Sequence, residues 1–94
     1  MKIDFDPAKH EITLMTRGLN LADAVLVFAG PTLTVEDDRK DYGEMRQITI
    51  GLLDGRMVLI AWTQRGDTRR IISMRKANDR EVLKYSPAFT KSGG

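Results

Sequence analysis

Three arginines in the second half of the chain have a placement that suits phosphate chemistry. Arg46 shares one side of an alternating segment with Ile48, and Arg75 shares one side of a later segment with Ile71. Arg65 belongs to a turn signal between the two segments. A guanidinium is permanently charged, and its planar fork of donors matches the oxygens of a phosphate. The three arginines therefore predict a phosphate-binding patch at an open face of a sheet.

The last alternating segment decides which arginines act together. Strict alternation places Arg69, Ile71, Ser73 and Arg75 on one side of it, and Ile72 and Met74 on the other. Trp62 and Tyr85 offer ring faces on which unpaired bases stack, which favours RNA as the ligand. Alternatives remain: a core position for Trp62, and ion pairs of Arg46 with Glu44 and of Arg75 with Glu81 or Asp79.

RNA cleavage is a reaction that such a patch can assist. The 2′-hydroxyl attacks the adjacent phosphate, and a protein helps by removing a proton, stabilising the charged phosphorane and protonating the leaving oxygen. Arginines supply the second function, and the candidates for the others are Glu44, Lys9, His10 and Tyr85. His10 lies between Lys9 and Glu11 on an expected helix, where we expect a solvated side chain rather than a catalytic one.

Several enzyme classes lack their residues in this sequence. The chain has no cysteine and a single histidine, which argues against disulfides, thiolate chemistry and a His-rich metal site. It has no Ser-His-Asp pattern, P-loop, zinc motif or dinucleotide fingerprint. We therefore expect no metal and no cofactor. No apolar stretch has the length of a membrane span or of a signal peptide, so a cytoplasmic protein is expected.

Charge is distributed unevenly along the 94 residues. Residues 1–44 hold five Lys/Arg and nine Asp/Glu, whereas residues 45–94 hold ten Lys/Arg and four Asp/Glu. A basic half attracts a polyanion, although solvated strand faces give the same composition. The length predicts one domain, which we place at residues 1–85, with a flexible tail over 86–94.

The elements that must position these residues form an α+β pattern. We expect strands over 2–5, 32–35, 46–52, 57–62 and 68–76, and helices over 7–17, 20–29 and 79–85. The sheet is predicted to be antiparallel, with about four to five strands. Two N-terminal helices cover one face, the opposite face is partly open, and a short C-terminal helix follows.

Local signals mark the ends of these elements. Caps are expected at Asp6, Gly18 and Asn20, a hairpin at Asp54-Gly55, and a capping box at Asn78 and Glu81. Ser86-Pro87 is expected to end the last helix. The predicted buried stripes are Ala8, Ile12 and Met15 on the first helix, and Leu21, Ala24, Val25 and Phe28 on the second.

The order of several short motifs resembles the BrnT family of toxins. The opening Phe5-Asp6-Pro7-Ala8-Lys9 is similar to the "(W/F)DPxK" start of that family. Further similar segments are Leu21-Ala22-Asp23-Ala24 with Val27-Phe28, the acidic loop that ends in Gly43-Glu44-x-Arg46, Ile50-Gly51, Arg65-Gly66, Arg70 to Ala77, and Glu81 with Tyr85. The resemblance covers roughly residues 3–85.

The resemblance implies a fold similar to RelE-type ribonucleases and a toxin that cleaves RNA and stops translation. It implies catalytic roles for Arg46 and Arg75 at the phosphate, and for Glu44 as a base or as the group that orients an arginine. It further implies RNA contacts by the side chains of Lys9, Arg65 and Tyr85. To these we add Arg69, which alternation places on the side of Arg75, and Arg17, whose charge can bind a phosphate.

The first helix departs from the family pattern. The family ends this helix with "KHG", often with an asparagine one turn earlier, and here Arg17 stands at the histidine position and Thr13 at the asparagine position. An arginine binds phosphate but stays protonated, which makes it a poor base. The sequence therefore leaves three hypotheses: a ribonuclease toxin, a catalytically weakened homologue that acts as antitoxin partner and co-repressor, and an unrelated α+β interaction domain with a charge-neutral open face.

The resemblance also implies a partner. It predicts a cognate antitoxin with a ribbon-helix-helix domain, which binds operator DNA and forms a hetero-oligomer with the toxin. We expect the antitoxin to cover the arginine face with an acidic or helical segment.

Overall fold

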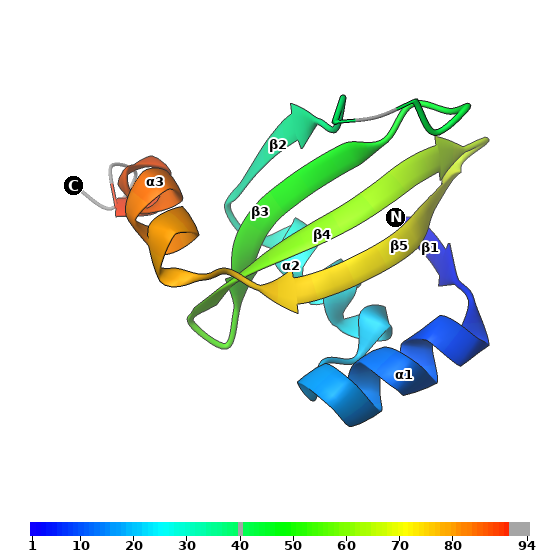
Figure 1. Ribbon diagram of the computed structural model, residues 1–94, viewed down its shortest axis with the longest axis horizontal. Coiled ribbons are helices and arrows are strands. Elements are labelled where there is room, and N and C mark those ends of the chain that lie inside the picture. The colour runs from blue at the N-terminus through cyan, green and yellow to red at the C-terminus, as the bar shows by residue number, and fades with distance from the viewer. Residues whose placement is uncertain (40, 91–94) are drawn as a thin grey trace.

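The computed structural model describes residues 1–39 and 41–90. The strands are β1 (Lys2–Phe5), β2 (Thr32–Glu36), β3 (Gln47–Leu53), β4 (Arg56–Arg65) and β5 (Thr68–Lys76). The helices are α1 (Pro7–Arg17), the 3-10 turn η1 (Leu21–Asp23), α2 (Ala24–Ala29) and α3 (Asp79–Thr90). The strands form one sheet in the order β1-β5-β4-β3-β2 (Figure 1). The predicted α+β class is confirmed.

The sheet is mixed rather than purely antiparallel, which corrects the expectation. Strands β2 to β5 form an antiparallel meander, but β1 pairs with β5 in parallel. The helices that follow β1 carry the chain to the far edge of the sheet, and the meander then returns toward β1. Because this long connection separates the two edges in sequence, β1 and β5 are free to run in the same direction.

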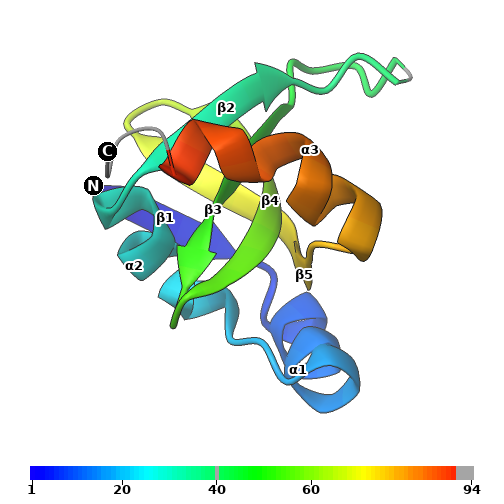
Figure 2. The ribbon, with the colours of Figure 1, turned by 90° about the vertical axis from the view of Figure 1, so that its left-hand side faces the viewer.

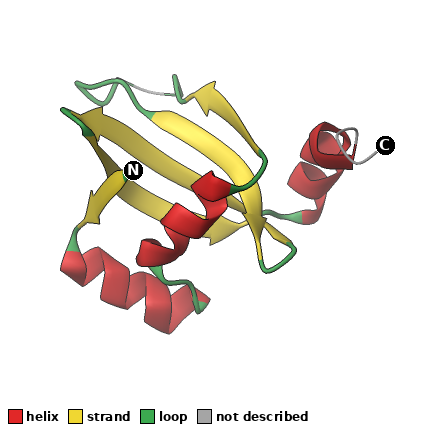
Figure 3. Ribbon diagram, turned by 180° about the vertical axis from the view of Figure 1, so that it is seen from behind, coloured by secondary structure: helices red, strands yellow, loops and turns green. Residues whose placement is uncertain are grey.

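The face of the sheet that carries Val58, Ile60 and Trp62 of β4 is called the covered face. Its core also contains Leu19, Leu21, Ala24, Val27, Ile71 and Met74. Figure 3 shows α2 lying across this face, with α1 beside the β5 edge. In Figure 2, α3 lies on the other side of the sheet from α1 and α2. Two N-terminal helices therefore belong to one side, as predicted.

Helix α1 has the predicted bounds and caps but not the predicted buried stripe. The Asp6 carboxylate accepts a hydrogen bond from the Ala8 N–H at 2.9 Å, and Gly18 ends the helix with a φ of 68°. Ile12 and Met15, however, are 61% and 85% exposed. The helix packs at the edge of the sheet and buries only Thr13, so periodicity selected the wrong side.

The second predicted helix is divided into η1 and α2. Asn20 caps it as predicted, accepting a hydrogen bond from the Ala22 N–H at 2.8 Å. The 3-10 turn has fewer residues per turn than an α-helix, so it shifts the phase of the residues that follow. As a result Val27 is fully buried, whereas Val25, which was predicted to be in the core, is exposed.

Strand β5 contains a bulge that strict alternation did not predict. Ala61 pairs with Ser73, but its neighbour Trp62 pairs with Ile71, so Ile72 is the extra residue. A bulge reverses which side the following residues take. Ile71 therefore lies on the covered face and Arg75 on the opposite one, and the predicted common side of these two residues is wrong. The predicted Asp54-Gly55 turn is confirmed, with φ values of 51° and 76°.

Helix α3 begins with the predicted capping box. The Glu81 N–H donates to Asn78 Oδ1 at 2.8 Å, and the Asn78 N–H donates to Glu81 Oε1 at 3.0 Å. The predicted end at Tyr85 is wrong, because the helix continues through Pro87 to Thr90. Tyr85 and Phe89 are one turn apart and both pack on the sheet, and this burial offsets the hydrogen bond that proline cannot make. Residues 91–94 of the predicted tail lie outside the described residues.

No single helix in the described ranges has the length and apolar character needed to cross a membrane, and only the sharply bent pair Pro7–Arg17 and Leu21–Ala29 meets both criteria when joined.

Candidate active site

The opposite face of the sheet, called the open face, carries Ile50, Met57 and Leu59 as a second buried cluster. Tyr85 and Phe89 of α3 cover one part of this cluster. Toward β5, the helix leaves a small pocket whose lining residues are Arg39, Ile48, Leu59, Ala61, Ser73 and Arg75. Ile48, Ile50 and Leu52 share this face as predicted. The predicted open face therefore exists, and arginines lie at its rim.

Arg75 is held by a carboxylate at one end of this pocket. Its two terminal nitrogens donate to the two carboxylate oxygens of Glu81 at 2.7 and 2.8 Å. Hydrogen bonding from Arg75 lowers the pKa of Glu81 from 4.5 to about 2, and the same contact raises the pKa of Arg75. Glu81 is also the capping residue of α3, so the start of this helix fixes the guanidinium in place. The predicted Arg75–Glu81 ion pair is confirmed.

Glu44 lies between two of the predicted arginines. Its carboxylate oxygens are 3.8 Å from Arg46 Nε and 3.6 Å from an Arg65 terminal nitrogen. The Arg46 guanidinium stacks on the Tyr42 ring at 3.9 Å, and its Nε is buried without a hydrogen bond among the described residues. Arg46, Arg65 and Glu44 thus meet, as the sequence predicted, at the end of the sheet away from α3. We call these three residues the Glu44 cluster.

Arg46 and Arg75 do not lie next to each other. Arg75 pairs with Leu59, and Leu59 pairs with Ile50, four residues from Arg46. Ordinary strand rise and spacing then separate the two arginine Cα atoms by roughly 16 Å. The predicted patch is therefore a row of groups along the open face rather than one tight cluster.

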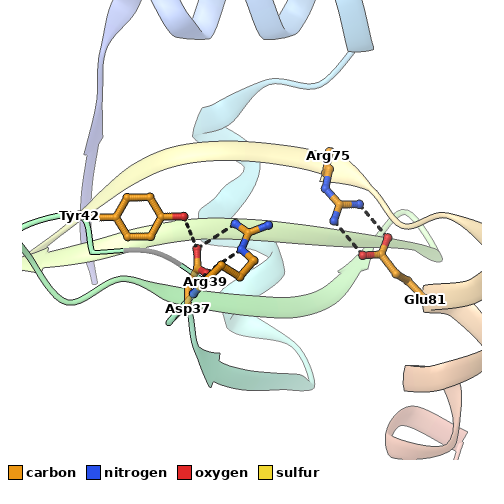
Figure 4. A network of polar contacts seen from close by, with 5 residues as sticks. All are labelled: Asp37, Arg39, Tyr42, Arg75 and Glu81. Carbon is orange, nitrogen blue, oxygen red and sulfur yellow. Dashed lines mark hydrogen bonds and ion pairs between the residues drawn. The ribbon is translucent and has the colours of Figure 1, made fainter.

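Residues of the β2–β3 loop connect the two ends of this row, and sequence reasoning missed them. Arg39 Nε and Nη2 donate to the Asp37 carboxylate at 2.7 and 2.9 Å, and the Tyr42 hydroxyl donates to the same group at 3.3 Å. These bonds lower the pKa of Asp37, mainly through Arg39, and raise the pKa of Arg39. Figure 4 shows that Tyr42, Arg39 and Arg75 follow one another in this spatial order along the sheet.

A signal for this loop was present in the sequence. An aspartate can hydrogen-bond the backbone two residues later, and Asp37 Oδ1 accepts from the Arg39 N–H at 3.4 Å. Asp37-x-Arg39 is therefore a local turn that places a guanidinium, whereas the segment was interpreted only as an acidic loop.

Arg69 and Trp62 belong to the covered face, which corrects two predictions. Trp62 is buried, and its indole N–H donates to Thr49 Oγ1 at 2.8 Å. The Arg69 guanidinium lies 4.3 Å from the centroid of Trp62 and 4.6 Å from that of Phe28. The alternative in which Trp62 occupies a core position is therefore the correct one, and its ring offers no face on which a base can stack. Because of the bulge in β5, Arg69 lies on the opposite face of the sheet from the pocket of Arg75.

Lys9 and Arg17 line a groove between α1 and β5. The other lining residues are Ile12, Thr13, Thr16, Ile72 and Ser73. Arg17 also donates to the Met74 carbonyl at 2.9 Å, on the part of β5 that lies beyond the end of β1. Ser73 lines both this groove and the pocket of Arg75. The groove of Lys9 and Arg17 and the pocket of Arg75 thus share Ser73.

His10 and Tyr85 have structural contacts. His10 Nδ1 accepts a hydrogen bond from the Leu21 N–H at 3.3 Å, and its ring packs 5.1 Å from that of Phe5. The expectation of a solvated His10 is wrong, since the side chain fixes the start of η1. Tyr85 packs on the open-face cluster, with Lys84 Nζ 5.3 Å from its ring centroid. Among the described residues there is no group of three His, Asp or Glu side chains able to hold a metal ion.

The comparison with known families gives one match. A family model described as the ribonuclease toxin BrnT of type II toxin–antitoxin systems matches residues 5–81. The matched span contains the Glu44 cluster, the β2–β3 loop and both partners of the Arg75–Glu81 pair. None of the curated proteins searched matches the chain.

Proposed function

The chain belongs to the BrnT family of ribonuclease toxins of type II toxin–antitoxin systems, and from this premise we propose that it is an endoribonuclease that cleaves RNA on the open face of its sheet and thereby inhibits translation. The observation that carries the proposal is the row of guanidiniums along that face, each contacting a carboxylate or a ring. A row of this kind follows the spaced phosphates of a single strand. It also argues against an interaction domain with a charge-neutral open face.

Arg75 and Arg46 are the proposed catalytic arginines. Arg75 contacts the phosphate whose negative charge grows as the 2′-oxygen attacks, and a fixed donor stabilises that charge. Arg46 contacts a phosphate farther along the row and aligns the strand for this attack. The new P–O bond forms at the 2′-oxygen as the bond to the 5′-oxygen breaks, so the products are a 2′,3′-cyclic phosphate and a 5′-hydroxyl. Glu44 lies within 4 Å of two guanidiniums, which favours its role as the group that orients Arg46 over a role as base.

The remaining predicted RNA contacts differ in how well their positions suit this site. Arg65 extends the row beyond Glu44, and Lys9 and Arg17 extend it over Ser73 to the other side of β5. Tyr85 borders the open face on α3. Arg69 lies on the covered face, so we do not include it in the RNA path.

The catalytically weakened homologue is the second candidate, and Arg17 favours it. In place of the family's histidine, this side chain donates to the Met74 carbonyl, which is a structural contact and not a proton transfer. A growth assay separates the two candidates. Expression without an antitoxin arrests growth if the chain is an active toxin, and leaves growth unchanged if it acts only as a partner.

A cognate antitoxin is the proposed partner, in the cytoplasm and in a hetero-oligomer. We propose that its toxin-binding segment is acidic and covers the arginines of the open face, and that a ribbon-helix-helix domain on the antitoxin binds operator DNA. A complex in which Arg46 and Arg75 stay accessible contradicts this mode of inhibition.

The decisive experiment is cleavage of a defined RNA by the purified chain, beside Arg46→Ala, Arg75→Ala and the control Arg56→Ala. Arg56 is exposed and begins β4, where it borders the groove near Gly18 and a second groove beside α3. It belongs neither to the pocket of Arg75 nor to the Glu44 cluster, so its replacement removes one positive charge and none of the proposed contacts. We expect cleavage by the parent and the control, and little by the other two variants. Lack of cleavage by a folded parent rejects the nuclease proposal.

A further inference from the structure

Two guanidiniums from distant parts of the chain face one small pocket on the open face. The β2–β3 loop supplies Arg39 and strand β5 supplies Arg75 (Figure 4). Between them the floor consists of Ile48, Leu59 and Ala61, with the Ser73 hydroxyl as its polar group. An apolar floor with a cationic rim on two sides is suited to an anion that enters from solvent.

Each of these guanidiniums is held from behind by a carboxylate. Asp37 and Glu81 bind Arg39 and Arg75 through two hydrogen bonds each. The carboxylate side chains are only 1% and 19% exposed, whereas the arginine side chains are 68% and 43% exposed. Two of the five N–H donors of each fork are used in this way, so donors remain for a ligand. The surface therefore presents the positive ends of two ion pairs.

The two guanidiniums are also close enough to repel each other. The charge of Arg39 lowers the pKa of Arg75, against the larger opposite effect of Glu81. An anion between the two arginines removes this repulsion and gains charge-assisted hydrogen bonds from both forks. A negative group bound between the two arginines thus stabilises their arrangement.

The size of the pocket limits what enters it. Its volume is about 40 Å³, whereas pockets that hold a whole small molecule have volumes of roughly 300 Å³ or more. A nucleobase does not fit, but the oxygens of one phosphate group do. A contact of this kind is independent of base identity.

We propose that Arg39 and Arg75 form a clamp for a single phosphate of the RNA backbone, in which Arg39 is a substrate-binding residue delivered by the β2–β3 loop. The clamp rests on the proposed function in that its ligand is the RNA of the nuclease reaction. Asp37 is a positioning residue, because it fixes the fork of Arg39 through two bonds and is itself fixed by the Tyr42 hydroxyl.

The test measures binding separately from cleavage. The probe is a fluorescent single-stranded oligonucleotide with deoxyribose at every position, which retains the phosphates and lacks the attacking 2′-hydroxyl. Its affinity is measured by anisotropy at several salt concentrations for the parent, Arg39→Ala, Arg39→Lys, Asp37→Asn and the charge-matched control Arg56→Ala. Arg39 is largely exposed, so its replacement leaves the core intact, and thermal unfolding of each variant checks this.

We expect Arg39→Ala to bind the probe about tenfold more weakly than the parent, as loss of a hydrogen bond to a charged group predicts. The slope of log affinity against log salt falls by about 0.7 for one lost phosphate on a single strand. Arg39→Lys retains the charge but loses the fork, and Asp37→Asn retains Arg39 but loosens it, so both give intermediate losses. Arg56→Ala binds as the parent does.

A double variant tests whether one phosphate is shared. If both arms hold the same group, Arg39→Ala combined with Arg75→Gln loses little more affinity than the worse single variant, because interacting residues are not additive. If the fold-loss of affinity in the double variant equals the product of the two single fold-losses, the two arginines make separate contacts, and this result overturns the clamp.

The outcomes separate this inference from the nuclease proposal. A parent that cleaves RNA while Arg39→Ala binds the probe as Arg56→Ala does overturns the clamp and leaves the nuclease intact. A parent that binds the probe through Arg39 but never cleaves RNA supports the clamp and rejects the nuclease. A parent that does not bind the probe overturns the clamp.

Discussion

Strand β5 carries arginines on both faces of the sheet, and two of them, Arg69 and Arg75, differ in what holds them. Arg69, on the covered face, stacks on the rings of Trp62 and Phe28, beside helices that close over a core. Arg75, on the open face, is bound by Glu81 and borders a pocket. An aromatic ring contacts the face of a guanidinium. A carboxylate binds in the plane of the guanidinium through two of its N–H groups and leaves the other N–H donors for a ligand. We therefore expect the covered face to contribute stability and the open face to contribute ligand binding.

The largest expected effect is the loss of Arg75 on cleavage. Arg75→Ala removes a donor to the developing phosphorane charge, and such donors contribute about 100- to 1,000-fold in rate. The measurement is single-turnover cleavage of a defined RNA by Arg75→Ala and by Arg69→Ala. Because both variants lose one arginine from the same strand, equal losses of rate contradict the division between the two faces.

Gly51→Ala tests the covered face with a change that adds only one methyl group. A Cβ at this position comes 2.5 Å from Val27 Cγ1 and 3.3 Å from Thr32 Cγ2. Val27 is fully buried and cannot move away, so we expect a loss of about 2 kcal/mol in the free energy of unfolding. Urea denaturation measures this loss. Cleavage per folded molecule is expected to be unchanged.

A second substitution checks the cause of that loss. Val27→Ala removes the atom that the new methyl group meets, so the loss in the double variant is smaller than the sum of the two single losses. Additive losses indicate that the steric contact with Val27 is not the cause.

The elements of the fold were largely predictable from the sequence, because their signals are local. The caps at Asp6 and Gly18, the Asp54-Gly55 hairpin and the Asn78–Glu81 capping box each depend on a few adjacent residues. The exceptions have tertiary causes. The bulge at Ile72 depends on pairing with β4, and the burial of Phe89 that extends α3 past Pro87 depends on the sheet.

The candidate site was predictable only in part, for the same reason. The Glu44 cluster unites residues that are near in sequence or at a turn, and it was found. The clamp unites Arg39 and Arg75, which only the sheet brings together, so the sequence showed Arg75 and not its partner. Arg69 was assigned to the site because alternation alone cannot reveal a bulge.

The ion pair of the open face makes stability depend on acid. The folded chain holds the pKa of Glu81 at about 2, below its ordinary 4.5. As the pH falls below 4.5, the unfolded chain binds this proton first, so the stabilisation is complete above that pH and is lost toward pH 2. We expect the pair to contribute about 1–2 kcal/mol, after allowing for solvent screening.

Comparison with Glu81→Gln isolates this group from the other carboxylates. Urea unfolding of both proteins at about pH 5 and about pH 2.5 gives two stability differences. The parent is expected to lose more stability on acidification than the variant does. Equal losses mean that Arg75 is not held by an ionised Glu81, and the contrast with Arg69 then disappears.

The smallest expected effect is the stability loss in Arg69→Ala. A guanidinium over the buried ring of Trp62 and the partly buried ring of Phe28 contributes about 1 kcal/mol. The stem of Arg69 also covers apolar surface, which becomes exposed to water in the variant. The rings carry no charge that titrates in acid, so the loss should be the same at about pH 5 and about pH 2.5, unlike that of the Arg75–Glu81 pair. Urea unfolding at both values measures it. A loss that shrinks in acid means that a carboxylate, and not the two rings, holds Arg69, and the two faces then stabilise their arginines in the same way.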